Sequence, residues 1–339
     1  MQKTLIAMAV GATIAAAPLV AAQADVKLRG KLQVDLVSLD GGKFDSEVQQ
    51  GDAGGRSRVF IDASKDLGNG MKAFGRYAWK TNPSNGSQIS ARDQWVGLKG
   101  SFGMVKFGRQ ATPYKMNGGV KWDPYAASFL EARRSGGMSG DSKGHNGFEN
   151  DVILYGSPKF AGIKFQLGYI ADENATGGGT KPSQRGTFLF GGTGVWGPVS
   201  GIAGYQNFKQ RAVGAVAGKD DVKQVKLGVR YKANGLIAAF QWEDVDSIGS
   251  IRVNGHKVTP KGQKGGKIIF LNLGYKFGNT LIAGNYGKTD ADGSGQDVDY
   301  GAIGVTYFFA KKVRAVLGYA VTETDTKYKM FGTYLRYDF

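Results

Sequence analysis

The chain has 339 residues, no cysteine and a formal net charge of +16. The lack of cysteine excludes a small scaffold stapled by disulfides, and a chain of this length can bury enough surface to be stable without them. Beyond residue 24 there is no run of about 18 apolar residues, so a membrane-spanning helix is also excluded.

Residues 1–24, MQKTLIAMAVGATIAAAPLVAAQA, have the pattern of a secretory signal peptide. Lys3 supplies a positive start, an apolar stretch follows from Leu5 to Pro18, and Ala22-Gln23-Ala24 fits a small-x-small cleavage site. A buried N-terminal helix is the alternative interpretation. We expect a mature chain of residues 25–339 with a formal charge of +15, since Lys3 is the only charged side chain in the removed part.

The first mature segment, DVKLRGKLQVDLVSL (25–39), alternates between two kinds of side chain. One parity is aliphatic from Val26 to Leu36, and the other carries Lys27, Arg29 and Lys31. Strand side chains alternate with period two, so the segment is a two-faced strand. A soluble sheet and a membrane barrel with a water-filled lumen both fit this single strand.

The remaining chain repeats one unit, in which two alternating strands flank a short turn and a longer polar loop follows. The short turns are rich in Gly, Asn and Pro, as tight hairpins are, and they lie at residues 65–70, 100–103, 157–162, 193–198, 232–235, 277–280 and 309–312. Longer connections lie near residues 40–55, 81–90, 110–150, 171–184, 209–221, 244–265, 289–298 and 322–327. Seven short and eight long connections join sixteen strands.

This regular order predicts an all-β meander with every short turn at one end. Lipid forbids an open sheet edge, so a membrane sheet must close into a barrel, and sixteen strands leave an aqueous channel. Tyr and Trp recur at strand ends, as membrane-interface girdles require. A soluble sandwich or propeller is the alternative. The strand that begins at Ala91 alternates poorly, which predicts that a subunit interface covers its outer face.

The connection at residues 110–150 is the longest and is expected to be functional. It contains WDPYAASFLEARR, in which Asp123 and Pro124 have the pattern of an N-cap and a first helical residue. A short helix is therefore predicted after Asp123. At the other end of the chain, an alternating strand finishes on Phe339, which resembles the terminal signal of outer-membrane barrels.

Several segments together carry a family resemblance: the signal peptide, SRVFIDASKDLGNGMKAFGRYAWK, ARDQWVGLKGSFGMVKFGRQ, ENDVILYGSPKFAG and the terminal Phe. They resemble the trimeric general porins of Gram-negative outer membranes over essentially the whole mature chain. The resemblance implies a transmembrane sixteen-stranded antiparallel β-barrel. It also implies that residues 110–150 fold into the lumen as a constriction loop, facing a wall of Arg and Lys.

The candidate pore residues follow from this resemblance. On the wall it places Lys31, Arg58 and Arg92, and strand parity adds Arg76. On the loop it places the acids Asp123 and Glu131, with Arg133 and Arg134 making the constriction more basic. Alternatives stay open: Asp123 would only cap its helix, Glu131 would pair with Arg134, and Arg76 would lie above or below the constriction.

The resemblance implies an outer-membrane porin that passes small hydrophilic solutes and ions by passive diffusion, with a preference for anions. The expected partners are two further copies of the chain, outer-membrane lipid and lipopolysaccharide, and the barrel assembly machinery through Phe339. No catalysis, cofactor, metal or nucleic acid is expected; DADGSGQD (290–297) has Gly301 where a calcium loop needs Glu. The alternatives are a porin selective for phosphate or other anionic solutes, and a barrel lipase or protease.

Overall fold

The computed structural model describes residues 24–51, 57–84, 86, 90–140, 147–171, 186–208, 221–258, 265–293 and 295–339. Residues 1–23, which carry most of the proposed signal peptide, lie outside this part. Among the described residues, no helix is long and apolar enough to cross a lipid bilayer.

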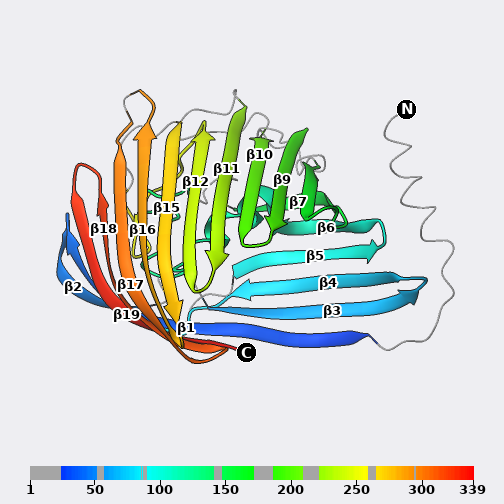
Figure 1. Ribbon diagram of the computed structural model, residues 1–339, viewed down its shortest axis with the longest axis horizontal. Helices are drawn as coiled ribbons and strands as arrows, with labels where there is room; N and C mark the ends of the chain where they lie inside the picture. Colours follow the sequence, from blue (N-terminus) through cyan, green and yellow to red (C-terminus); the bar gives the residue numbers. More distant parts are fainter. Residues whose placement is uncertain are drawn as a thin grey trace.

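Most of the described chain is strand (Figure 1). The strands of the first half are β1 (Asp25–Gly41), β2 (Phe44–Gly51), β3 (Arg58–Gly68), β4 (Met71–Lys80), β5 (Ser90–Gly100), β6 (Gly103–Ala111), β7 (Phe148–Gly156), β8 (Ile163–Ile170), β9 (Thr187–Trp196) and β10 (Val199–Phe208). The second half holds β11 (Val222–Ala233), β12 (Leu236–Val245), β13 (Arg252–Val253), β14 (His256–Lys257), β15 (Gly266–Phe277), β16 (Thr280–Ala291), β17 (Val298–Ala310), β18 (Val313–Glu323) and β19 (Lys327–Asp338). The helices are α2 (Pro113–Met116) and the 3-10 turn η1 (Gly119–Lys121).

All strands except β13 and β14 form one closed antiparallel sheet of 17 hydrogen-bonded segments. β2 and β3 both pair with β1, since Glu47 lies opposite Leu39 and Arg58 lies opposite Lys31. They are thus two parts of a single barrel strand, and the barrel has sixteen strands. Pairing of β1 with β19 closes it. Both the fold class and the strand number predicted from the sequence are confirmed.

The hairpin turns follow from local sequence. In the turns Asn69-Gly70 and Asn234-Gly235 both residues have positive φ, with values of 50° and 75° in the first and 51° and 82° in the second. This is the type I′ geometry that matches the twist of a hairpin. All seven predicted short turns are present. The long first connection expected at 40–55 is wrong in part, because the chain turns tightly after Gly41 and continues as β2.

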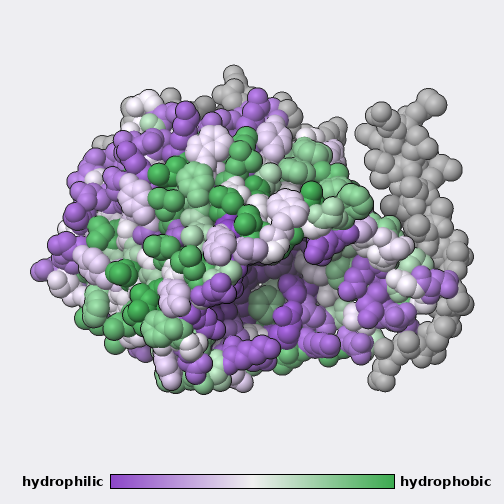
Figure 2. All heavy atoms as spheres, viewed as in Figure 1, coloured by the Kyte–Doolittle hydropathy of each residue, from purple (hydrophilic) through white to green (hydrophobic). Residues whose placement is uncertain are grey.

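The outer surface of the barrel is apolar in its middle. Figure 2 shows hydrophobic residues across the middle of the upright strands and hydrophilic residues toward their ends. Val26, Leu28, Leu32 and Leu36 of β1 are all exposed outward, as the alternation predicted. Exposed aromatic residues also gather at the short-turn ends of the strands, as a girdle at the lipid interface does: Trp196, Tyr231, Tyr275, Phe277, Tyr307, Phe309 and Tyr337.

The poor alternation of the segment after Ala91 has a local cause. Gln94 lies opposite Tyr77 and Ala91 lies opposite Trp79, so two residues, Arg92 and Asp93, share the space opposite one. This is a β-bulge. The extra residue interrupts the alternation of inward and outward side chains along β5, while the same side of the sheet continues to face the lipid. The irregular pattern in β5 therefore does not by itself require a covering subunit.

The interior of the barrel has two different halves. Loop L3, defined here as residues 112–147 between β6 and β7, packs apolar side chains onto the inner wall of β15–β19 and β1. Tyr125, Phe129 and Leu130 are buried there against Leu281, Tyr300 and other inward residues. The opposite half, on β3–β8, carries the cationic residues described below. L3 thus fills one side of the lumen and leaves space on the other.

The helix predicted after Asp123 is absent, because the segment from Asp123 to Leu130 is a series of turns. Ala127 lies in the left-handed region with a φ of 69°, which a continuous helix does not allow. The amides of Tyr125, Ala127 and Leu130 are bound by nearby side chains instead of by helical carbonyls. The helical residues of L3 come earlier, in α2 and η1.

Candidate functional site: the pore and its inner loop

L3 is fastened to the inner wall at both of its ends by one carboxylate. Glu243 of β12, fully buried, accepts hydrogen bonds from the hydroxyl of Tyr114 (2.7 Å) and from that of Ser139 (2.6 Å). Gln241 donates to it from the same strand face (2.8 Å). Tyr114 lies near the start of L3 and Ser139 near its end, so a single side chain holds both ends of the loop.

The middle of L3 is fastened to neighbouring strands of the same wall. The hydroxyl of Tyr125 lies 2.7 Å from the carbonyl oxygen of Ala283 on β16 and 2.5 Å from that of Gly304 on β17. Side chains from the wall bind L3 carbonyls in return: Gln33 binds Ala127, Thr289 binds Gly136, Tyr300 binds Leu130 and Thr322 binds Ser135. The described part of L3, residues 112–140, is consequently fixed in its middle as well as near its ends.

Asp123 lies inside this attachment. Its carboxylate accepts hydrogen bonds from the amides of Tyr125 and Ala132 (both 2.9 Å) and from the side chain of Asn285 on β16 (2.8 Å). Burial raises the pKa of Asp123 to about 7, against the effect of these donors. Asp123 therefore stabilises the conformation of L3 by binding its backbone amides, as a capping residue does. Its side chain is buried against Asn285 of β16 and does not face the open part of the lumen.

The predicted wall and loop cations come together at the level where L3 begins. Arg58 lies opposite Lys31 on one side and opposite Lys80 on the other. The guanidinium of Arg92 lies 4.4 Å from the centre of the Phe148 ring, and the ammonium of Lys115 lies 4.2 Å from the same ring. Strand β1, strands β3–β5 and L3 thus each contribute a cation.

Arg133 joins the group from the loop side. Its side chain forms an ion pair with Glu131 (2.8 Å), two residues away instead of the three that the helical spacing suggested. Arg134 instead lies in the left-handed region with a φ of 76°, and its carbonyl accepts from the amide of Arg252. Arg134 faces a small space shared with Glu131 and Arg252, on the side of L3 toward the loop that joins β12 to β15.

The pKa of Lys115 shows that positive charge is in excess around it. Burial lowers the pKa of Lys115 well below its usual range, and the charges of Arg133, Arg92 and Arg58 act in the same direction. Glu131 opposes them. Six cationic side chains gather here, namely Lys31, Arg58, Lys80, Arg92, Lys115 and Arg133, whereas the buried carboxylates on these inner faces are Asp35, Glu131 and Glu149. We call these six the cation cluster.

Arg76 does not belong to the cation cluster. It lies opposite Asp62, four residues closer to the short turn than the Arg58–Lys80 pair, which is about 13 Å along the strand. Asp62 binds the guanidinium of Arg76 (2.7 Å) and also that of Arg29. Arg76 therefore lies below the level of the Arg58–Lys80 pair, which was one of the two alternatives for it. Its guanidinium forms an ion pair with the carboxylate of Asp62.

Two members of the cation cluster were missed from the sequence. Lys80 ends the third strand on the lumen parity, and that parity was a sufficient signal to include it. Lys115 had no such signal, because it lies in PYKMNGG of L3, whose fold is not periodic. Thr112 caps α2 by accepting a hydrogen bond from the amide of Lys115.

Comparisons with known proteins agree with the barrel and its inner loop. A family model described as Gram-negative porin matches residues 6–327. The chain belongs to the Gram-negative porin family. It is a multi-pass β-barrel of the outer membrane, and its fold and family are those of channel proteins.

Two curated porins illustrate the relationship. The major outer membrane protein P.IB of Neisseria meningitidis serogroup A is 26% identical over 336 residues, covering 94% of this chain and 92% of the relative. Outer membrane porin protein 32 of Delftia acidovorans is 29% identical over 284 residues, covering 78% of this chain and 77% of the relative.

Solved porin structures share the fold. An anion-selective porin from Comamonas acidovorans has a TM-score of 0.76 at 20% identity, covering 94% of this chain and 100% of that chain. OmpF of Salmonella typhi, in complex with daunomycin, has a TM-score of 0.73 at 16% identity, covering 93% and 97%. OmpT of Vibrio cholerae in a trimer form has a TM-score of 0.66 at 18% identity, covering 94% and 100%.

Proposed function

We propose that this porin passes small hydrophilic solutes and ions by passive diffusion, with a preference for anions. The observation that carries the proposal is the cation cluster, in which cationic side chains outnumber the buried carboxylates around the open side of L3. A narrow channel with low-dielectric walls focuses the field of its fixed charges, and rings of Arg and Lys favour anions. The Comamonas acidovorans porin, which shares the fold and is described as anion-selective, supports the same direction.

The porin acts as a homotrimer in this proposal. The outer face of β3–β6 has a hollow of about 530 Å³, lined by Ile61, Ala63, Tyr77, Val96 and Phe107 among others. An apolar hollow on a sheet face suits the packing of a second protein surface. The trimer form of the related OmpT structure supports this assembly. Mass measurement in mild detergent tests it, and a monomer as the sole species would contradict it.

Export and insertion complete the proposal. Residues 1–24 are removed as a signal peptide, and Phe339 is read by the barrel assembly machinery. In the folded barrel the amide and carbonyl of Phe339 both pair with Gly30, and a Cβ at Gly30 would overlap the Phe339 ring. In this proposal, cations at the long-loop rim contact the phosphates of lipopolysaccharide.

The reversal potential across a bilayer in a salt gradient tests the anion preference. We expect the wild-type porin to be anion-selective, most strongly at low salt, where the Debye length is about 30 Å at 0.01 M against about 3 Å at 1 M. Replacing Arg58 and Arg92 together by Ser lowers the chloride-to-potassium permeability ratio. Arg76→Ser is the control, because Arg76 is bound by Asp62 and lies about 13 Å along the strand from the Arg58–Lys80 pair.

Two results would refute this account. The first is a cation-selective wild-type channel, which would show that the cation cluster does not set the sign. The second is an Arg58 and Arg92 double variant whose ratio equals that of Arg76→Ser. Either result leaves the porin fold intact and removes only the assignment of selectivity to these residues.

A further inference from the structure

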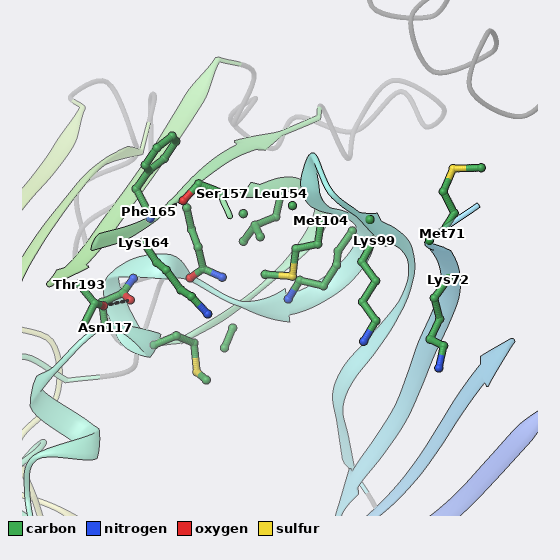
Figure 3. Close-up of a pocket in the computed structure, with 18 of the residues that line it drawn as sticks. Met71, Lys72, Lys99, Met104, Asn117, Leu154, Ser157, Lys164, Phe165 and Thr193 are labelled. Atoms are coloured by element: carbon green, nitrogen blue, oxygen red, sulfur yellow. Dashed lines mark hydrogen bonds between the residues drawn. The ribbon is translucent and has the colours of Figure 1, made fainter. Parts of the chain in front are cut away.

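A second group of cations lies below the cation cluster, at the short-turn end of the lumen. A cavity of about 760 Å³ opens there between the inner wall of β4–β9 and the start of L3. Five lysines line it, namely Lys72, Lys99, Lys106, Lys121 and Lys164, and we call this space the lysine vestibule. Figure 3 shows Lys72, Lys99 and Lys164 extending from three different strands toward the same side of the wall.

The vestibule is separate from the cation cluster. Lys72 and Lys80 lie eight residues apart on β4, which is about 26 Å along the strand. A strand tilt of about 40° reduces this to about 20 Å along the barrel axis. Short turns of such barrels face the periplasm. A solute that enters from outside therefore passes the cation cluster first and reaches the vestibule afterwards.

The charge of the vestibule is poorly balanced. Within the described residues, none of its five lysines forms an ion pair with a carboxylate. Asp66 is the acid that lines the space, and its side chain accepts a hydrogen bond from the amide of Gly68 in the turn. Lys72 lies directly opposite Lys99 on β5 and directly opposite Asp66 on β3, so one carboxylate faces two neighbouring lysines and leaves an excess of positive charge.

Two of the lysines rest on aromatic rings. The ammonium of Lys99 lies 5.3 Å from the centre of the Phe74 ring, and that of Lys106 lies 4.8 Å from the Trp95 ring. These contacts orient the side chains without forming an ion pair. Asp93 on β5 acts on Lys106 as an opposite charge, so this lysine is partly compensated. Burial lowers the pKa of Lys121 on the loop side, so an anion beside it would favour its charged form.

The rest of the lining is apolar or neutral. Met104 and Leu154 on the wall and Met116 on L3 face the space, with Asn117 bound to Thr193 (2.7 Å) at its edge. Methionine adapts its shape to varied apolar surfaces. Lysines act as point charges that do not demand the planar geometry an arginine fork selects. The volume lies in the range of sites that enclose an organic ligand.

We propose that the lysine vestibule binds multivalent organic anions, whose charged groups meet the lysines while an apolar body lies on the methionine side. The inference rests on the proposed pore only in that the anion reaches the vestibule through it. A bound anion of this class lies on the path of chloride below the cation cluster and interrupts the chloride current. Diffusion of such solutes through the porin is then saturable, because the channel contains a binding site for them.

Blockade of single-channel chloride current tests the proposal. The probe is trimesate, a benzene ring with three carboxylates, added first to one side of the bilayer and then to the other. Trimetaphosphate has the same charge without an apolar body, and benzenetrimethanol has the ring without charge. We expect saturable block by trimesate, weaker block by trimetaphosphate and none by the triol, with the stronger effect from the short-turn side.

A pair of variants locates the site. Replacing Lys99 and Lys164 by Gln should raise the half-blocking concentration of trimesate about tenfold, since two near charges are lost. Replacing Lys311 and Lys312 by Gln is the matched control, because these exposed lysines form the β17–β18 turn at the same end of the barrel, outside the vestibule.

The possible failures are distinguishable from those of the proposed function. Absence of saturable block, equal block in both lysine variants, or equal affinity for trimetaphosphate and trimesate would each overturn the vestibule proposal, whatever the reversal potential shows. A wild-type channel that is not anion-selective but is blocked by trimesate in the predicted order would refute the selectivity assignment and support the vestibule.

Discussion

The attachment of L3 through Glu243 makes a sharp prediction, because one side chain binds both ends of the loop. Replacing Glu243 by Ala removes the acceptor of the Tyr114 hydroxyl, of the Ser139 hydroxyl and of the Gln241 amide. All of these groups are buried, so the lost bonds are not simply exchanged for bonds to bulk water. We expect L3 to detach from the wall far more often than in the wild type.

The magnitude follows from the contacts. The Tyr114 hydroxyl can turn to the carbonyl oxygen of Val225, 3.2 Å away, so three donors lose this acceptor, namely the amide and hydroxyl of Ser139 and the side chain of Gln241. Each buried unsatisfied donor costs about 1–3 kcal/mol, and the buried ammonium of Lys226 also loses an attractive carboxylate, so we expect a cost of at least about 3 kcal/mol. A change of this size raises the population of detached L3 about 100-fold. Glu243→Gln keeps one acceptor and should give a smaller effect.

Hydrogen exchange followed by mass spectrometry measures the detachment directly, because slow amide exchange reports local opening. Amides of residues 112–140 should exchange about 100-fold faster in Glu243→Ala, while those of the barrel strands stay unchanged. Glu323→Ala is the control, since its ion pair with Lys327 is half-exposed and contributes little. Unchanged exchange in L3, or equal acceleration of the strands, would refute the role assigned to Glu243.

Three further predictions concern L3. Deleting residues 120–140 should widen the pore in solute-swelling assays and lower the melting temperature of the barrel, because it uncovers the apolar wall of β15–β19; an unchanged size cutoff would place the loop outside the pore. The pKa of Asp123 is raised from 3.8 to about 7, so its contribution to L3 stability is greatest below pH 3.8 and is lost as the pH rises through about 7. In Asp123→Asn the local opening of L3, measured by hydrogen exchange, should no longer depend on pH between these two values. If that pH dependence is retained, another group is responsible for it. A Cβ at Gly287 would overlap the Cα of Gly137, so Gly287→Ala should displace L3 and lower the free energy of unfolding by about 1–3 kcal/mol. Gly301→Ala is the control, because a Cβ there meets nothing within 4 Å, and its melting temperature should equal that of the wild type.

Much of the barrel was predictable from residues 25–339, because the relevant signals are local. The alternation of Val26, Leu28 and Leu32 with Lys27 and Lys31 assigns each face of β1 without knowledge of its neighbours. Asn-Gly pairs mark hairpin turns through their own backbone preferences. Strand number and class then follow from counting such signals, and closure follows from the need to satisfy every backbone group in lipid.

Other features depend on which distant segments meet. The β5 bulge was visible only as poor alternation after Ala91, since the two residues facing one are defined by the pairing with β4. The helical pattern after Asp123 was overruled because the Asp123 and Glu131 carboxylates bind loop amides and Asn285 reaches in from β16. Propensity is a weak preference, and tertiary contacts of this kind override it.

The sequence by itself determined two-faced strands, sixteen in number, with an excess of positive charge and one unusually long loop, because alternation, turn chemistry and composition are properties of neighbouring residues. Only the tertiary structure decided how that charge is distributed. Cross-strand register pairs Arg76 with Asp62 and removes it from the cation cluster, while the docking of L3 brings Lys115 to Arg92 and Arg58. Coulomb interactions depend on distance in space, and that distance is set by register and loop docking, which no short stretch of the chain encodes.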